Sequence, residues 1–564
     1  MKNTLIIEKL NGHDKDGKIG KINVVVGDSV QAEDVLFTIE SGKGSLKYKS
    51  KYDGIVTDLT IKAGDVVVLD QEIGSIDGEK QVAKKSTGYS FGISKPMKKE
   101  MHAEVLIIGG GPGGYVAAIR SAQLGKKVIL IEEDKLGGTC LNYGCIPTKA
   151  LAHSTKVLKH IKEGSEFGFD VDNVSIDMTK LMTRKSEVVD NLVGGIEHLM
   201  EVNDIEVIRG RAQTKSETVI GVKNKKIDAE ITFEDLIIAT GSEPSFIPIE
   251  GHDLKSVMTS KDALEITGIP KSITIIGGGV IGMEFAFIFN ALGSEVHVIE
   301  YMPEILALLD QDVVDVIKTS AEEKGIHIHS GACASAIHET QNNEMITTYM
   351  IDDKTYYISS EKVMMAVGRK PRLDSIDLDI LGVSLNSKKN GIQVNEHMKT
   401  NKEHIYAIGD VTNIIQLAHV ASHQGMVASE VIAGIDSKMS YEIIPSAIFT
   451  KPEIGHVGVT EREATENKLD ITVSKFYMAA NGKSVAMNET EGFVKVIYDN
   501  QKEYIIGASI VGGHGTDMIA TLVNLIQQKV CKEDLTHVIY AHPTAAESIH
   551  EALLGLEGRG IHNG

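Results

Sequence analysis

Residues 137–149 read GGTCLNYGCIPTK, and this stretch holds two of only four cysteines in a chain of 564 residues. Cys140 and Cys145 are separated by four residues, so a disulfide between them can open and close with little backbone movement. A close pair in a cysteine-poor chain is more often catalytic than structural. We therefore predict a redox centre here, whereas the isolated Cys333 and Cys531 are predicted to be buried small side chains.

The composition is that of a globular protein with several domains. Hydrophobic residues make up 42% of the chain and charged residues 24%, which are ordinary values, and the length predicts roughly three to five domains. The net charge of −20 argues against a nucleic-acid partner, because nucleic-acid binders present a basic face. The sequence has no apolar run of about 18 residues and no long apolar stretch at its start, so we expect no membrane span and a cytoplasmic location.

The segment before the cysteines has the pattern of a dinucleotide-binding βαβ unit. A buried-strand run over 104–109 leads into Gly109-x-Gly111-x-x-Gly114, and a helix is expected over 115–124. The following strand ends in Glu132, 23 residues after Gly109. Such glycines let the backbone approach a pyrophosphate at a helix N-terminus, and the acid accepts a hydrogen bond from a ribose hydroxyl. The complete context makes this a strong dinucleotide-site prediction.

The same unit recurs later in the chain. A strand over 272–276 leads into Gly277-x-Gly279-x-x-Gly282, and Glu300 again follows the first glycine by 23 residues. Two dinucleotide sites in one chain predict electron transfer between two cofactors. Glu300 would repel a ribose 2′-phosphate, so the second site favours NAD over NADP. The first site adjoins the cysteines and is assigned to FAD, because a flavin can exchange electrons with thiols and accept a hydride.

Residues 1–77 contain an internal repeat with an offset of 37 residues. Gly27-Asp28 matches Gly64-Asp65, and the apolar positions around these turns match as well. Short β-type runs split by Gly-Asp turns predict two halves that close as a pseudo-twofold β sandwich. The link over 40–45 is expected to be a hairpin with Lys43 at its tip.

This module resembles the lipoyl domains of 2-oxoacid dehydrogenase complexes. Glu40, Ser41 and Lys43 match the modified tip of those domains, whereas Gly42 and Gly44 replace the usual Asp and Ala. The resemblance implies a covalent lipoyl group on Lys43. Residues 78–102 are expected to form a flexible linker, with docking of the alternating apolar residues over 89–93 as an open alternative.

Residues 103–564 resemble the flavin disulfide reductases and, within them, the dihydrolipoamide dehydrogenases. The motifs that carry the resemblance occur in the family's order over 137–149, 239–242, 277–284, 367–369, 408–410 and 541–544. The resemblance implies an α/β fold with two Rossmann-like dinucleotide-binding domains and an α+β dimerisation domain, preceded by the small all-β lipoyl domain. The expected parts are FAD-binding over 103–250, NAD-binding over 251–370, a central part over 371–444 and dimerisation over 445–564.

The resemblance also assigns cofactor-binding residues. Glu132 is expected to bind the FAD ribose, Lys149 to approach the flavin N5, and Asp410 to hold the ribityl chain. Glu284 is expected to pair with Lys149 near the nicotinamide. The remaining positions are Gly138, Thr139, Ala212, Thr240, Gly241 and Ala418 for FAD, and Gly368 for NAD, beside the two glycine motifs and Glu300.

His542 is the predicted catalytic base. It precedes a proline, and Glu547 follows five residues later, so the carboxylate can orient the imidazole and raise its basicity. The resemblance implies that His542 reaches the active site of the other subunit, which predicts a homodimer with composite sites.

The implied reaction oxidises protein-bound dihydrolipoamide to lipoamide through the Cys140–Cys145 disulfide and FAD, with NAD as the final acceptor. The implied partner is a lipoyl-bearing acyltransferase or carrier protein of a multienzyme complex. Glutathione and trypanothione reductases fit poorly because they use NADP, and mercuric reductases because they carry a C-terminal cysteine pair. A second class of function, a carrier or scaffold acting through residues 1–77, is compatible with the enzyme.

Overall fold

The computed structural model describes residues 2–7, 10, 16–31, 34–41, 44–80 and 96–562. The chain divides into two compact units, Met1–Lys95 and Pro96–Gly564. Each unit has a hydrophobic core of its own, and each is described separately below.

The smaller unit is a sandwich of two four-stranded antiparallel sheets, with strand orders β1-β8-β6-β3 and β5-β4-β2-β7. Leu36, Phe37, Ile39, Ile73 and Ile76 are among the buried side chains between them. The strands are β1 (Lys2–Ile6), β2 (Asp16–Ile22), β3 (Ser29–Val30), β4 (Val35–Ser41), β5 (Gly44–Lys49), β6 (Tyr52–Leu59), β7 (Val66–Val68) and β8 (Glu72–Lys80).

The predicted 37-residue repeat appears as a twofold pattern of hydrogen bonds. Gly27 N donates to Val56 O at 2.8 Å, and Gly64 N donates to the equivalent Ile19 O at 2.7 Å. Both glycines have a positive φ, 104° and 97°, which only glycine adopts readily. The two halves therefore exchange strands, since β2 pairs with β7 and β3 pairs with β6.

Strands β4 and β5 form the expected hairpin. They pair antiparallel, and Ser41 lies opposite Gly44. Lys43, the predicted attachment site at the tip of the hairpin, lies outside the described residues.

The predicted linker over 78–102 is too long at both ends. Strand β8 continues to Lys80, and β9 begins at Met97. Residues 97–102 pair in parallel with β14, and most of their side chains are exposed. This first half of β9 extends beyond the buried part of its sheet, so its side chains are mostly polar. A polar stretch is also typical of a linker, and the sequence alone therefore did not reveal the strand. Residues 81–95, including the apolar positions over 89–93, lie outside the described residues.

The larger unit begins with a seven-stranded sheet. The order is β11-β10-β9-β14-β13-β12. Strand β25 pairs with the C-terminal end of β14, on the edge of that strand opposite β9, so residues beyond 400 complete the first nucleotide fold. The strands are β9 (Met97–Ile108), β10 (Val128–Glu132), β11 (Glu206–Arg209), β12 (Ala212–Ser216), β13 (Val219–Lys223), β14 (Ile227–Ile238) and β25 (Ile405–Ala407). The helices are α1 (Pro112–Gln123), α2 (Gly138–Tyr143), α3 (Cys145–Lys162), α4 (Met178–Val202) and α9 (Ala418–Ile432).

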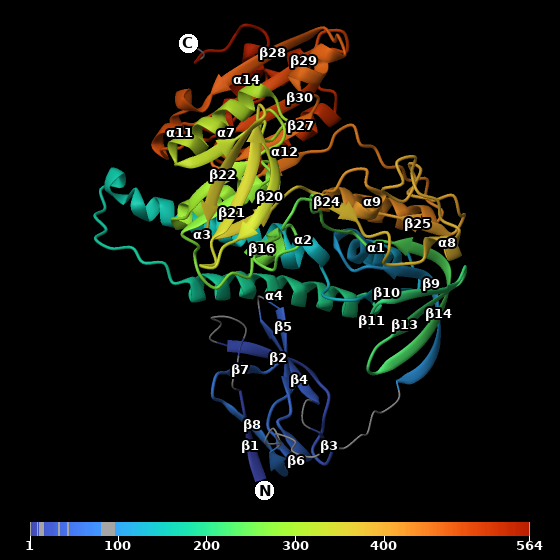
Figure 1. Ribbon diagram of the computed structural model, residues 1–564. Coiled ribbons are helices and arrows are strands. Elements are labelled where there is room, and N and C mark those ends of the chain that lie inside the picture. The colour runs from blue at the N-terminus through green and yellow to red at the C-terminus, as the bar shows by residue number, and fades with distance from the viewer. Residues whose placement is uncertain are drawn as a thin grey trace. The chain divides into compact units, whose positions relative to one another are not determined.

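A second parallel sheet forms the other nucleotide fold, with the order β16-β23-β17-β18-β19. A separate antiparallel sheet of β20, β21 and β22 appears in yellow in Figure 1. The elements are β16 (Val257–Met258), β17 (Ser272–Ile276), α6 (Val280–Leu292), β18 (Glu295–Ile299), α7 (Gln311–Glu323), β19 (Ile326–His329), β20 (Cys333–Glu339), β21 (Met345–Ile351), β22 (Lys354–Ser360) and β23 (Lys362–Met365). A ribbon of β15 (Ser242–Pro244) and β24 (Arg369–Pro371) links the two folds.

The C-terminal part is an antiparallel sheet covered by helices, orange to red in Figure 1. The strand order is β26-β27-β30-β29-β28. The elements are β26 (Ser446–Ile448), β27 (Ile454–Gly458), α10 (Glu461–Glu466), β28 (Ile471–Tyr477), β29 (Phe493–Asp499), β30 (Tyr504–Val511), α12 (Gly515–Gln527) and α14 (Glu547–Gly555).

A buried lysine joins this part to the second nucleotide fold. The Lys495 ammonium lies 2.7 Å from Asp310 and 2.8 Å from Asp312, and its side chain is fully buried. Glu461 is a third carboxylate, 3.3 Å away.

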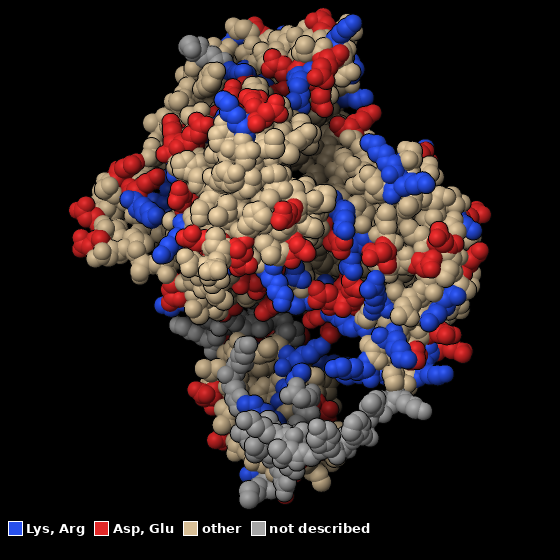
Figure 2. Space-filling model, in the orientation of Figure 1, with Lys and Arg blue, Asp and Glu red and all other residues tan. Residues whose placement is uncertain are grey.

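The face of the molecule shown in Figure 2 is mixed in charge. On the face shown in Figure 2, the described Lys and Arg side chains are interspersed with Asp and Glu. Among the described residues, none of the helices combines the length and apolar character that a bilayer crossing requires.

Candidate active site

One cavity of about 1270 Å³ connects most of the predicted site residues. Both glycine loops, both predicted redox cysteines, Lys149 and Glu284 line it, and every lining residue belongs to the larger unit. The cavity thus joins two nucleotide folds to a thiol pair without an intervening wall.

The first glycine loop is shaped by close backbone contacts. A Cβ at Gly114 would lie 1.7 Å from Gly109 O, and a Cβ at Gly109 would lie 2.2 Å from Ala239 O, so both positions require glycine. Glu132 accepts hydrogen bonds from Gly110 N at 2.6 Å and from Asp134 N at 2.7 Å. Burial raises the pKa of this carboxyl, and the two backbone donors oppose that effect.

The second loop repeats this construction. Glu300 accepts from Gly278 N at 2.5 Å and from Met302 N at 2.7 Å. A Cβ at Gly282 would lie 1.9 Å from Gly277 O, whereas a Cβ at Gly279 would meet nothing within 4 Å. Gly279 therefore faces open space in the cavity, and Gly282 keeps the helix close to the strand without lining the cavity.

Several other predicted positions also form an open cradle suited to large cofactors. Gly241 and Gly368 line the cavity, and a Cβ at either would meet nothing within 4 Å. Both have a positive φ, 72° and 103°. Other predicted cofactor-binding residues that line the cavity are Gly111, Gly138, Thr139, Ala212, Thr240, Asp410 and Ala418. The residues present therefore fit two extended dinucleotides.

The cysteines lie at the junction of two helices. Cys140 is on α2 and half-buried, Cys145 begins α3, and both are free thiols in this structure. The hydrogen bond to Cys145 and burial raise the pKa of Cys140. The hydrogen bond from Cys140 lowers the pKa of Cys145 to about 7, with burial opposing and Lys149 assisting. The two thiols are thus differentiated, with the thiolate favoured at Cys145.

Lys149 lies one turn along α3 from Cys145. Its ammonium is 2.8 Å from both carboxylate oxygens of Glu284 on α6, and it lies 4.5 Å above the Phe449 ring. Glu284 also accepts from Phe449 N at 3.0 Å. The predicted pair therefore forms, and the segment between strands β26 and β27 of the C-terminal sheet braces it.

A polar chain crosses the cavity wall beside Asp410. Ser242 Oγ donates to Asp410 at 2.5 Å, and Arg369 donates from Nε to Ser242 Oγ at 2.8 Å. Arg369 also reaches Ser242 O at 2.7 Å, and burial lowers the pKa of its guanidinium. Ser242 and Arg369 lie within the motifs over 239–242 and 367–369, but the sequence predicted no role for either residue. Their positions in those motifs were the only indication in the sequence, because their hydrogen-bond partners are more than 120 residues away.

His542 and Glu547 lie together but apart from the cavity. His542 Nδ1 is 2.9 Å from Glu547 Oε1, and the imidazole is 79% exposed. Thr544 N donates to the other carboxylate oxygen at 2.8 Å. This backbone hydrogen bond, followed by that with His542, lowers the pKa of Glu547. Neither residue lines the cavity of its own chain.

The two isolated cysteines differ from the prediction. Cys333 is exposed and lines the cavity, and Cys531 is half-buried. Cys333 begins β20, where side chains alternate between core and solvent, and the sequence does not reveal which side it takes.

Known proteins share these features. Residues 103–425 match the family described as pyridine nucleotide-disulphide oxidoreductase, residues 444–553 match its dimerisation domain, and residues 12–76 match the biotin/lipoyl family described as biotin-requiring enzyme. The dihydrolipoyl dehydrogenase of Bacillus subtilis (strain 168) is 39% identical over 458 residues, which cover 81% of this chain and 99% of the relative. A dihydrolipoyl dehydrogenase of Haloferax volcanii is 40% identical over 465 residues, covering 81% and 97%.

A solved structure agrees with these matches. The HOCl-induced flavoprotein disulfide reductase RclA from Escherichia coli superposes with a TM-score of 0.71 at 28% identity, covering 80% of this chain and 99% of that one. Both nucleotide loops, the thiol pair and the C-terminal sheet fall within the matched regions. The chain therefore belongs to the pyridine nucleotide-disulphide oxidoreductase family, within the group that contains the dihydrolipoyl dehydrogenases.

Proposed function

We propose that this protein oxidises protein-bound dihydrolipoamide to lipoamide, using FAD and NAD, as the dehydrogenase component of a multienzyme complex. The observation that carries the proposal is the single cavity that joins two dinucleotide loops to Cys140 and Cys145. The dihydrolipoyl dehydrogenase relatives and the lipoyl-type N-terminal match support the substrate class.

The residues that would hold the cofactors belong to the two loops. The Gly109–Gly114 turn, Glu132 and Asp410 would hold FAD, and the Gly277–Gly282 turn with Glu300 would hold NAD. When bound, FAD supplies a two-electron acceptor beside the thiols and NAD the final hydride acceptor. Glu300 places a carboxylate where a ribose 2′-phosphate would need a cation, which favours NAD over NADP.

The thiol chemistry follows from the difference between the cysteines. With the enzyme disulfide closed, a substrate thiolate attacks Cys140, the bond to Cys145 breaks, and Cys145 leaves as a thiolate. Its pKa of about 7 suits it to this role, because a thiol of lower pKa is the better leaving group. The second substrate thiol then displaces Cys140. The substrate loses two electrons and two protons and becomes lipoamide, while the enzyme gains a dithiol.

His542 would remove the proton from the substrate thiol. Glu547 holds Nδ1 of the imidazole, which leaves Nε2 directed to solvent and open to a substrate. Because His542 lies outside its own chain's cavity, we propose that it serves the cavity of the partner subunit in a homodimer. The match of residues 444–553 to the family's dimerisation domain supports this arrangement.

Lys43 is proposed to carry the lipoyl group. The matching family covers both biotin and lipoyl attachment, so the sequence around Lys43 decides between them, and it has no methionine on either side of the lysine. A tethered arm raises the local concentration of its dithiol at the enzyme. Intact-mass measurement of the chain from its native host tests the modification, and an unmodified Lys43 would refute it.

A cytoplasmic location rests on the redox cysteines of a cysteine-poor chain. The partner is a lipoyl-bearing acyltransferase or carrier protein, and co-purification from native extract would identify it. The FAD, NAD, central and dimerisation parts are proposed at 103–250, 251–370, 371–444 and 445–564.

The activity is tested by NADH formation from free dihydrolipoamide. The full-length chain should reduce NAD+ with far higher kcat/KM than NADP+. Lys43→Arg should keep this activity, because free substrate does not need the arm, and Cys145→Ser should abolish it. Turnover of glutathione with NADPH instead, or full activity in Cys145→Ser, would overturn the proposal.

A further inference from the structure

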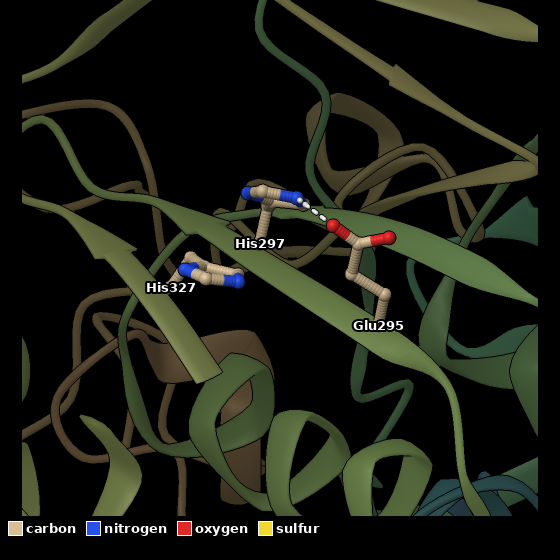
Figure 3. A group of neighbouring side chains, drawn as sticks. All are labelled: Glu295, His297 and His327. Carbon is tan, nitrogen blue, oxygen red and sulfur yellow. Dashed lines mark hydrogen bonds and ion pairs between the residues drawn. The ribbon is translucent and has the colours of Figure 1, made fainter. Parts of the chain in front are cut away.

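A cluster of histidines lies on the second nucleotide sheet. Strands β18 and β19 pair in parallel, with His297 opposite His327. Side chains two residues apart in a strand share a face, so Glu295 and His329 lie on the same face as this pair. Figure 3 shows Glu295 and His297 pointing toward each other, with the His327 ring beside them. None of these residues lines the redox cavity.

The ligand atoms of three of these side chains converge. One atom each from Glu295, His297 and His327 lies within 4.8 Å of the others. Glu295 Oε1 is 3.3 Å from His297 Nε2, and the two imidazole centroids are 4.7 Å apart. Ligands bound at about 2.0–2.2 Å to a tetrahedral ion lie about 3.3–3.6 Å apart. Glu295 and His327 are exposed, and we expect rotation of these two side chains to bring the ligand atoms to that spacing.

Nδ1 of His297, the ring nitrogen that does not face Glu295, already has a hydrogen-bond partner. This nitrogen is 3.3 Å from His329 Nε2, and His329 Nδ1 is 3.2 Å from the Tyr349 hydroxyl. Tyr349 is 4% exposed and anchors the chain of contacts in the core. This arrangement leaves His297 Nε2 facing Glu295 and His327. Metal-bound histidines characteristically have the second ring nitrogen fixed in this way.

His327 has a ring nitrogen lone pair available to bind a metal ion. Among the described residues its ring makes no hydrogen bond, so both nitrogens are open.

We propose that Glu295, His297 and His327 bind one divalent transition-metal ion of the Zn²⁺ and Cu²⁺ class, with solvent completing the coordination. Two imidazoles and a carboxylate select this class over Mg²⁺ or Ca²⁺, which prefer all-oxygen sites. The ion joins β18 to the edge strand β19. Glu300 directly follows β18 and donates its N–H to His329 O at 2.9 Å, so the same strand pair supports the second glycine loop.

The first measurement is Zn²⁺ affinity on the full-length, FAD-loaded, oxidised protein, by competition with a chromogenic zinc chelator. We expect one site per chain, weakened about tenfold or more in His297→Asn and in His327→Asn, since even outer partners contribute about 10–100-fold to metal affinity. His338→Asn, at an exposed position on β20 outside the cluster, is the matched control and should leave affinity unchanged. If His297→Asn does not fold, His327→Asn and Glu295→Gln decide, because both alter exposed side chains.

The second measurement identifies the ligands by electron paramagnetic resonance of bound Cu²⁺. Nitrogen couplings from imidazole are expected, with one fewer nitrogen in His327→Asn. Sulfur ligation would assign the ion to a cysteine and overturn the proposal. Zn²⁺ affinity unchanged in both histidine variants, or the absence of a defined site, would likewise overturn it.

Discussion

The ammonium of Lys149 lies 2.8 Å from both carboxylate oxygens of Glu284, and this contact ties the first nucleotide fold to the second beside the thiol pair. Lys149 is on the helix that begins at Cys145, and Glu284 is buried on the helix that follows the second glycine loop. The charges act on Cys145 in opposite senses, since Lys149 lowers its pKa and Glu284 raises it. The pair therefore adjusts how much of the Cys145 thiol is ionised near neutral pH, beside the larger effect of the hydrogen bond with Cys140.

Exchanging either charge should move the pKa of Cys145 in a predictable direction. Lys149→Gln removes a cation and should raise it, whereas Glu284→Gln removes an anion and should lower it below about 7. The thiolate is present above the pKa and lost as the pH falls through it. The pH midpoint of iodoacetamide labelling at Cys145, read by peptide mass spectrometry on reduced, FAD-free protein, measures the shift. Shifts of the same sign in both variants would contradict the assignment.

Two glycines of the second loop should respond differently to the same change. Gly282→Ala places a Cβ 1.9 Å from Gly277 O, and overpacking of this kind costs about 1–3 kcal/mol or more. Gly279→Ala meets no protein atom within 4 Å, so the protein should fold normally. Its methyl group enters the cradle and should raise KM for NAD about tenfold, or about 1.4 kcal/mol. Thermal unfolding and steady-state kinetics separate the outcomes, and an unaltered Tm in Gly282→Ala would refute the packing argument.

Sequence motifs predicted those parts of the site whose geometry depends on residues close together in the chain. The glycine turns and the acids Glu132 and Glu300 follow from short-range spacing, because each turn and its acid lie within one βαβ unit. The cysteine pair is likewise evident locally, because only four residues separate the two thiols. The Arg369–Ser242 contact and the burial of Lys495 depend on segments more than a hundred residues apart, and spacing cannot specify them. The same limit hid the histidine cluster, although His297 and the alternating His327 and His329 each lie on strands whose parallel register brings them together.

Lys495 should be the most sensitive charged residue outside the cavity. Lys495→Met leaves Asp310 and Asp312 without their buried cation, and breaking a buried ion pair costs about 3–5 kcal/mol. Lys475→Met removes a partly exposed partner of Asp312 and should cost about 0–1 kcal/mol. Differential scanning calorimetry compares the two. Equal, small losses of Tm would show that Lys495 is not a critical link.

The same cluster should make stability depend on acid. Burial disfavours ionisation of Asp310 and Asp312, but hydrogen bonds from Lys495, and from Lys475 to Asp312, outweigh it and lower the pKa of both carboxyls. A carboxyl with a depressed pKa stabilises the fold above its ordinary pKa, and that stability is lost as the pH falls through the folded value. The wild-type Tm should therefore fall on acidification, and the acid dependence should be weaker in Lys495→Met. A parallel acid dependence in both proteins would contradict this cause.

His542 should matter for thiol chemistry and not for the nicotinamide side. His542→Gln should lower the rate with dihydrolipoamide about 10²–10⁴-fold, the range for loss of a general base. Oxidation of NADH by an artificial acceptor does not use the thiol proton and should be unchanged. Glu547→Gln keeps a hydrogen bond to the imidazole but removes its charge, so a smaller loss is expected. Equal losses in both assays would indicate a structural defect instead.

Composite sites can be tested by complementation between two inactive variants. Cys145→Ser and His542→Gln should each be nearly inactive as homodimers. If His542 serves the partner's cavity, a co-expressed heterodimer of the two contains one site with both defects and one site with neither. Dihydrolipoamide oxidation should therefore reappear in the heterodimer, isolated with two different affinity tags, at about half the wild-type kcat per dimer. If His542 instead served its own chain's cavity, each site of the heterodimer would keep one defect, and no activity would return.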